Sequence, residues 1–198
     1  MATSAAVAEG AVAAAAVPKL PTDRWRATEI AFWLVVVAAF FVFPQHRVLG
    51  SQILITGLFA LSLDLILGYA GIVSLGHAAY FGMGAYAAGL LAVHGWGEPI
   101  SGLVVAGAVG AVVGFATSFL VVRGTDLARL MVTLGIGLML YEAANQLPSI
   151  TGGADGLSGV SMKKVFGAFA FDLSGTTAYV YSAAVLFLLF LVARRVVA

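Results

Sequence analysis

Three ionisable side chains interrupt otherwise apolar stretches of this sequence: Asp64, His77 and Glu142. If these stretches cross a membrane, such groups are costly and become candidate functional positions. Glu142 is followed one helical turn later by Asn145 and Gln146, so the three would form a polar face able to line a hydrophilic path. Two interpretations of Asp64 are open: it makes a structural polar contact near headgroup water, or it has a functional role. His77 is expected one and a half turns into its helix. It would either hydrogen-bond to a neighbouring helix or act as a ligand or proton relay.

The remaining sequence motifs do not favour an enzyme. The sequence has no H-E-x-x-H pair, no G-x-S-x-G elbow and no closely spaced pair of carboxylates. Ser74 and His77 would lie one turn apart, but no acid or oxyanion hole accompanies them. The chain has no cysteine, which excludes thiolate nucleophiles, iron–sulfur clusters and disulfides. We therefore expect no catalytic residue and no metal site.

Neither of two glycine-rich stretches fits a nucleotide-binding motif in both its letters and its setting. Residues 82–87 read GMGAYA, the pattern G-x-G-x-x-A, but they lie within an apolar run rather than between a strand and a helix. Residues 152–156 lack the Gly-Lys-Ser/Thr ending of a phosphate-binding loop. We therefore expect this chain to bind no nucleotide or other cofactor itself.

The composition indicates an integral membrane protein. Of the 198 residues, 62% are hydrophobic and 10% are charged, against about 25% charged residues in a typical soluble protein. A net charge of +1 provides no basic field for nucleic acid. The apolar runs are continuous rather than alternating, which favours helices over a membrane barrel. We predict an all-α, polytopic helical bundle.

Six apolar runs approach the length of about twenty residues that spans a bilayer. Short turns with proline, glycine or charged residues separate them. The predicted spans cover residues 27–43, 48–67, 72–93, 100–122, 127–147 and 178–192. Residues 1–26 are expected to form a disordered tail and 27–198 the transmembrane domain, with a glycine-rich loop at 148–177.

The basic residues predict the orientation of these spans. Alternating the six spans places seven Lys and Arg residues on one side and three on the other, and the richer side is expected to be cytoplasmic. The richer side holds Lys19, Arg24, Arg26, Arg123, Arg129, Arg194 and Arg195, and the poorer side holds Arg47, Lys163 and Lys164. Both termini would then be cytosolic, and the loop at 148–177 would face outward.

Small residues recur at helical spacing in the third and fourth runs. Such stripes let helix backbones approach closely within lipid, and the same residues could instead line a substrate path. The third run carries Ala78, Gly82, Ala85 and Gly89, and the fourth carries Gly102, Ala106, Gly110 and Gly114.

Two stretches resemble one transporter family. Residues 68–86, GYAGIVSLGHAAYFGMGAY, are similar to the run G-Y-x-G-x-x-S-L-G-H-A-x-x-x-G-x-G-A-Y of permease subunits of branched-chain amino acid ABC importers. Residues 130–134, Asn145 and residues 151–157, TGGADGL, resemble the LivM-type subunit in particular. The motif positions present here are Gly68, Gly71, Ser74, Gly76, His77, Thr151, Gly152, Gly153, Asp155 and Gly156.

The resemblance implies a subunit that supplies helix packing and a path rather than chemistry. It would pair with a homologous permease in the bacterial cytoplasmic membrane and receive leucine, isoleucine or valine from an extracytoplasmic solute-binding protein. Two cytosolic ATPase subunits would bind ATP and Mg and drive alternating access. The motif residues would line the path or shape a re-entrant segment.

The sequence departs from the family at its end. Relatives continue past the equivalent of Arg194 and Arg195 into a cytosolic segment that docks on the ATPase, whereas this sequence stops at Ala198. The expectation is a fragment or a truncated product. Two alternatives remain: a permease for urea or short amides, and an uncoupled channel-like or assembly protein of the membrane.

Overall fold

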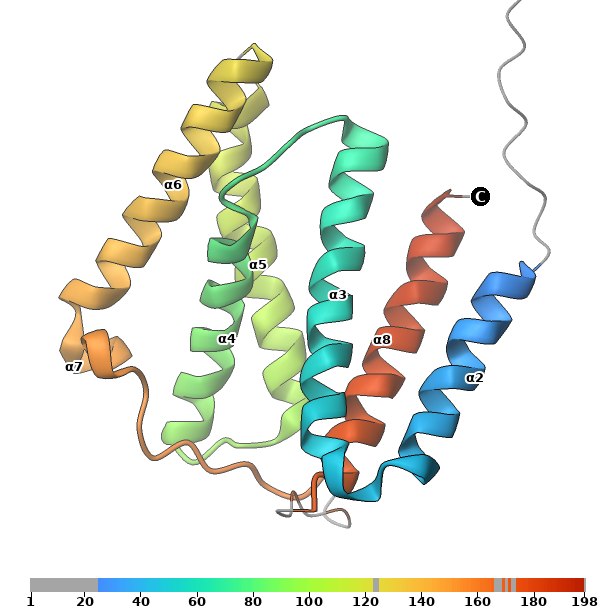
Figure 1. Cartoon of the computed structure of the whole chain (residues 1–198). Helices are drawn as coiled ribbons and strands as arrows, with labels where there is room; N and C mark the ends of the chain where they lie inside the picture. Colours follow the sequence, from blue (N-terminus) through green and yellow to red (C-terminus); the bar gives the residue numbers. More distant parts are fainter. Residues whose placement is uncertain (1–24, 123–124, 166–168, 170, 172–173, 198) are drawn as a thin grey trace, which may run out of the picture.

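The computed structural model describes residues 25–122, 125–165, 169, 171 and 174–197. The predicted tail at 1–26 therefore falls almost wholly outside the described residues. The described chain is a bundle of long helices (Figure 1), and its only β pairing is an isolated bridge between Val165 and Phe169. This confirms the all-α prediction. The long helices are α2 Ala27–Val42, α3 Arg47–Ala70, α4 His77–Val93, α5 Pro99–Val122, α6 Asp126–Gln146 and α8 Thr176–Val197, and the short ones are η1 Pro44–His46, α7 Pro148–Thr151 and η2 Gly153–Asp155.

Four helical stretches are long and apolar enough to cross a membrane, judged by length and composition. They are Pro44–Tyr69, Pro99–Val122, Asp126–Gln146 and Thr176–Val196. Helix α2 has 16 residues and α4 has 17, which gives each a length of about 25 Å against a hydrocarbon core of roughly 30 Å. The total of six spans stays a prediction that depends on these two helices.

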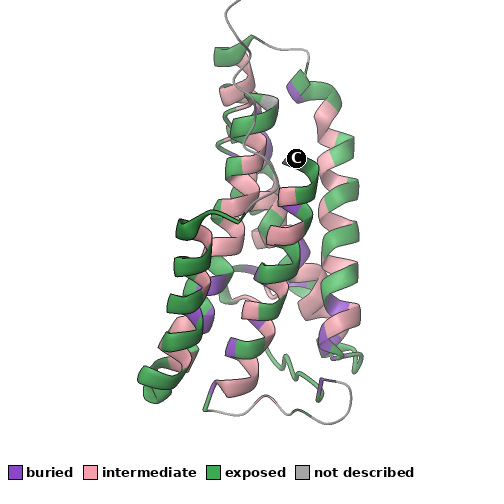
Figure 2. Ribbon diagram, turned by 90° about the vertical axis from the view of Figure 1, so that its right-hand side faces the viewer, coloured by how far each residue is buried: buried purple, intermediate pink, exposed green. Residues whose placement is uncertain are grey.

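The surface of the bundle is apolar over most of its height. Figure 2 shows exposed positions along the lengths of the helices. Many of the exposed residues are large and apolar, among them Phe41, Val112 and Phe115 at about 70% exposure. Contiguous apolar surface on this scale is rare in soluble monomers. The bundle therefore fits lipid as its solvent, as the composition predicts.

The long helices form two groups that lie side by side (Figure 1). In one group α3 packs along α8, with α2 beside them; in the other α4 packs along α5 and α6 closes against both. The hydrogen bonds between the groups include that from the Tyr181 hydroxyl to the Pro99 carbonyl oxygen, at 2.9 Å, and that between Ser62 Oγ of α3 and His77 Nε2 of α4, at 2.8 Å. The few contacts between the groups leave apolar cavities between them.

The first group is centred on Val36, Leu54, Tyr179 and Leu186. The Tyr179 hydroxyl donates to the Val36 carbonyl oxygen at 2.7 Å, which joins α8 to the middle of α2. The Tyr179 ring lies against Gly50, where an added Cβ would be 2.8 Å from Cδ2 of the ring. Glycine at this position therefore lets α3 and α8 pack closely.

A charged and aromatic contact joins the first turn of α2 to the last turn of α8. Arg194 Nη1 lies 3.1 Å from Glu29 Oε2, and the guanidinium also lies over the Trp25 ring at 4.8 Å. Trp25 in turn stacks on Phe187 of α8. The segment before α2 thus contacts α8 through Trp25.

The second group depends on close approach of α4 and α5. A Cβ added to Gly84 would lie 3.1 Å from the Ala106 carbonyl oxygen, and one added to Gly102 would lie 3.7 Å from Ala88 Cβ. Gly84 is thus the α4 glycine nearest to α5, although the sequence stripe did not include it. The letters alone do not indicate which face of an all-apolar helix meets its neighbour.

The other residues of the predicted stripes have different neighbours. A Cβ on Gly110 would lie 3.8 Å from the Tyr80 carbonyl oxygen of α4, whereas Gly82 and Gly114 have open space around them. Gly89 faces Leu157, whose Cδ1 would be 2.9 Å from an added Cβ. Ala85 lines an apolar cavity between the helix groups. The α4 stripe therefore faces several elements rather than one.

Candidate functional site

The chain leaves helical geometry between α3 and α4. Gly71, in the left-handed region at φ 61°, ends α3, and the Ile72 amide caps it at 3.5 Å from the Ile66 carbonyl oxygen. Residues 72–76 are not helical and descend beside the bundle before α4 begins at His77 (Figure 1). The predicted helical run from residue 72 is therefore wrong in its first five residues. Glycine can adopt the left-handed conformation that other residues avoid, so Gly71 permits the stop.

The nonhelical segment is held against α6 by Thr133. The Leu75 amide donates to Thr133 Oγ1 at 3.2 Å, and that hydroxyl donates to the Leu130 carbonyl oxygen at 3.1 Å. Thr133 is 2% exposed. Gly76 packs so closely on α6 that an added Cβ would overlap the Thr133 carbonyl oxygen. Because a backbone N–H at membrane depth needs a partner within the protein, Thr133 supplies a polar contact that the sequence reasoning missed.

His77 joins the break to α3. Its Nε2 lies 2.8 Å from Ser62 Oγ, and its ring lies 5.2 Å from the ring of Phe59. The expectation that His77 lies well inside its helix is wrong, since it is the first residue of α4. The contact with Ser62 is a hydrogen bond to a neighbouring helix, the first of the two interpretations considered for His77.

The second family-like stretch folds back over the end of α6. Thr151 is buried, and its hydroxyl contacts the Ala144 carbonyl oxygen and, at 2.8 Å, that of Leu147. The Gly153 amide donates to the same hydroxyl at 3.3 Å. Thr151 is therefore the centre of a compact cap, formed by α7 and η2, within the predicted loop at 148–177.

Glycines make this cap possible. Gly152 has φ 79°, and an added Cβ there would overlap the Gly156 carbonyl oxygen. A Cβ on Gly153 would lie 3.3 Å from the Asn145 carbonyl oxygen of α6. The cap leads into Leu157, which reaches Gly89 of α4. The stretch at 151–157 thus bridges the ends of α6 and α4.

A cleft of about 320 Å³ lies between α4 and α6. Four residues singled out in the sequence line it: Gly76, Ala78, Gly82 and Asn145. Tyr86, Tyr141 and the Asn145 amide supply polar groups, while leucines and Met83 supply apolar wall. Residues from both family-like stretches therefore meet at one cleft, although more than forty positions separate the two stretches in the chain.

The remaining candidate residues lie elsewhere. Glu142 is exposed, and its Oε1 accepts from Gln146 Nε2 at 2.7 Å without lining the cleft. Asp64 is exposed on α3, and Ser74 is half-buried in the nonhelical segment. Gly68 and Gly71 are exposed, while Asp155 and Gly156 lie in and after η2. That these residues line a path stays a prediction.

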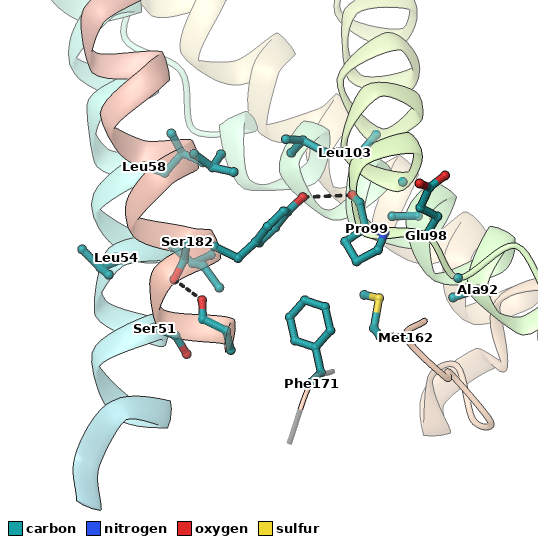
Figure 3. Close-up of a pocket in the computed structure, with 18 of the residues that line it drawn as sticks. Ser51, Leu54, Leu58, Ala92, Glu98, Pro99, Leu103, Met162, Phe171 and Ser182 are labelled. Carbon is teal, nitrogen blue, oxygen red and sulfur yellow. Dashed lines mark hydrogen bonds between the residues drawn. The ribbon is translucent and has the colours of Figure 1, made fainter. Parts of the chain in front are cut away.

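A second cavity, of about 330 Å³, lies between the two helix groups (Figure 3). Leu58 and Ser182 of the first group, Pro99 and Leu103 of the second, and Phe171 are among the residues that line it. Almost all of its lining is apolar. Gly102 and Ala106 of the predicted α5 stripe line it, but sequence reasoning did not indicate a cavity here, because most of the lining residues are of types common in helix packing. A cavity without polar partners is a poor place for the charged groups of an amino acid.

Comparison with known proteins gives one consistent result. Residues 47–197 match the family described as branched-chain amino acid transport system / permease component. The high-affinity branched-chain amino acid transport system permease protein LivM of Salmonella typhimurium is 30% identical over 140 residues, covering 70% of this chain and 33% of the relative. The protein of the same name from Escherichia coli is 32% identical over 144 residues, with the same coverages. No solved structure matches the chain significantly.

The chain aligns with about a third of the length of these curated relatives. The family match nevertheless extends from the first residue of α3 to the last residue of α8 and includes both stretches that meet at the cleft. The chain belongs to the family of branched-chain amino acid transport system permease components.

Proposed function

We propose that this chain is a membrane-spanning permease subunit of an ABC importer that moves leucine, isoleucine or valine across the bacterial cytoplasmic membrane. Six helices cross, both termini face the cytosol and the cap at 148–156 faces outward. A homologous second permease completes the path, and a solute-binding protein delivers the substrate. Two cytosolic ATPases bind ATP and Mg. The family, the named relatives and the distribution of basic residues support this proposal.

One observation carries the proposal: both family-like stretches converge on the cleft between α4 and α6. The nonhelical segment before His77 reaches it through Leu75 and Gly76, and the second family-like stretch reaches it through Leu134 and Asn145. In transporters, broken helices at membrane depth are where substrates meet backbone and side-chain polar groups. A helix break beside a cleft is therefore a reasonable place for a path.

The lining of the cleft suits a small amino acid with an apolar side chain. The Asn145 amide and the hydroxyls of Tyr86 and Tyr141 can hydrogen-bond carboxylate and ammonium groups, and Leu134 and Leu138 offer apolar wall. Alternating access would open this cleft to each side in turn as the ATPases close and open. The chain's own contribution is to position these groups.

The proposal is tested by uptake and by co-purification in the native host. We expect an in-frame deletion to abolish high-affinity uptake of labelled leucine, isoleucine and valine, while uptake of urea and acetamide continues. Asn145→Leu should raise KM for leucine at least tenfold, because a hydrogen bond to a charged group contributes roughly 1.5–3 kcal/mol. Gln52→Leu, the same change at an exposed site on α3, should leave KM unchanged.

Affinity purification in mild detergent should also recover a second permease and ATPase subunits. Loss of urea or amide uptake in the deletion strain would show that the substrate is urea or a short amide rather than a branched-chain amino acid. Recovery of the chain without any ATPase, together with unchanged amino acid uptake, would favour the uncoupled channel-like or assembly protein.

A further inference from the structure

A groove between α2 and α3 lies outside the cleft and the cavity already described. It has a volume of about 570 Å³, and its floor is formed by Tyr179 and Leu186 of α8. Its walls are apolar along both helices, and Phe32, Val35 and Ile53 on its edges are more than half exposed. The groove is therefore open to the surroundings of the bundle, where lipid is the solvent.

Arg47 lies at one end of this groove, beside His46. Its Nη1 donates to Thr176 Oγ1 at 2.9 Å, and its guanidinium lies over the Phe40 ring at 4.4 Å. Its Nε is buried without a hydrogen-bond partner, and within the described residues no carboxylate pairs with it. The Nη groups of a partly buried arginine without a carboxylate partner favour an anion with several acceptor oxygens, such as a phosphate.

The position of Arg47 fits the level of the lipid headgroups. It follows the exposed turn Pro44–His46 between two apolar helices, and such a polar turn must lie at the membrane–water interface. From Arg47 to Gly57, the lining of α3 extends over ten residues, or about 15 Å of helix. That is half of the roughly 30 Å hydrocarbon core, the depth of one leaflet.

We propose that the groove binds one anionic phospholipid, with its phosphate on Arg47 and an acyl chain along α2 and α3 towards Gly57. Charge selects the headgroup, and the groove's depth matches a chain from a single leaflet. The lipid fills space that helix packing leaves open between α2 and α3, because the packing residues Trp33, Val36 and Phe40 of α2 contact α8. The site is separate from the proposed transport path.

The test uses the full chain purified from membranes in mild detergent, with lipid binding followed by thermal unfolding and by native mass spectrometry. Saturating phosphatidylglycerol should raise the melting temperature by about 5 °C and leave one lipid bound. Phosphatidylcholine should do neither. Glycerol phosphate, which carries the charge without acyl chains, should also have no effect.

Two variants distinguish the contribution of the lipid headgroup from that of the acyl chain. Arg47→Gln should lower phosphatidylglycerol affinity about tenfold, whereas Lys164→Gln, which removes a charge from an exposed side chain, should not. Gly57→Leu should also lose the lipid although Arg47 remains, since the nearest neighbour of a Cβ there is Leu186 Cδ2 at 3.9 Å and the side chain would fill the groove. Each shift is measured against the lipid-free form of the same variant.

Equal stabilisation by phosphatidylcholine would overturn the proposal, as would an undiminished shift in Arg47→Gln or in Gly57→Leu. Stabilisation by glycerol phosphate would reassign the site to a soluble anion. If the chain self-associates and Gly57→Leu abolishes that association, the groove is an interface with a second copy of the chain and not a lipid site.

Discussion

Replacing Gly76 by alanine is expected to lower the melting temperature of the chain by roughly 5 °C and to abolish uptake. A Cβ at this position would overlap the Thr133 carbonyl oxygen and lie 3.0 Å from its carbonyl carbon. Both atoms belong to the backbone of α6, so the added methyl group displaces a helix rather than a side chain. Overpacking of this kind destabilises by about 1–3 kcal/mol, and 1 kcal/mol corresponds to about 2–4 °C in a chain of this length.

The backbone conformation of Gly76 is not the reason for this effect. Its φ of −94° and ψ of 4° are accessible to alanine, so the expected loss is steric. Gly135→Ala is the matched control, because Gly135 lies on α6 with open space around it. That substitution should be neutral or slightly stabilising, since alanine favours the helix by about 1 kcal/mol. Equal melting temperatures for Gly76→Ala and Gly135→Ala would show that the segment does not pack on α6.

Gly152→Ala is expected to unfold the cap at the end of α6. The change forces alanine into the left-handed region at φ 79° and places its Cβ over the Gly156 carbonyl oxygen. The first effect costs about 1–2 kcal/mol, and the overlap adds about 1–3 kcal/mol. Trypsin cleavage at Lys163 and Lys164, both exposed, should become at least tenfold faster as the cap opens.

Gly159→Ala separates the two contributions. Gly159 also has a positive φ, 75°, but a Cβ there meets nothing within 4 Å. This variant should therefore show the conformational cost alone and a smaller increase in cleavage. If both variants were cleaved at the same rate, close packing of Gly152 within the cap would be refuted.

The fold class was predictable because it depends on composition. Continuous apolar runs without alternating polarity permit only helices within lipid, and the turns at Pro44 and Pro99 lie where the chain reverses. The break before His77 was not predictable from hydropathy. Ile72, Val73 and Leu75 are as apolar as the helix that follows them, so the run of apolar residues conceals the change of backbone conformation.

The site was predictable only in its residues and not in its arrangement. The motif letters singled out Gly76 and Asn145, and the structure brings both to one cleft. Glu142 was expected on the same face as Asn145; its carboxylate instead contacts Gln146, and of the two residues Asn145 alone lines the cleft. Thr133 lies within the family-like stretch at 130–134, but it was not singled out, because one threonine in an apolar helix is commonplace.

The absence of cysteine from the sequence permits the most direct test of the proposed path. The measurement is the rate at which a charged, membrane-impermeant thiol reagent modifies Gly82→Cys in native membranes. Gly82 lines the cleft with open space around it, whereas Phe115→Cys would place the thiol on the exposed apolar face of α5. If the substrate path runs between α4 and α6, Gly82→Cys should be modified rapidly, and saturating leucine should slow that modification at least tenfold. Phe115→Cys should be modified little. Modification of Gly82→Cys that is no faster than that of Phe115→Cys, or that leucine leaves unchanged, would contradict a substrate path between α4 and α6.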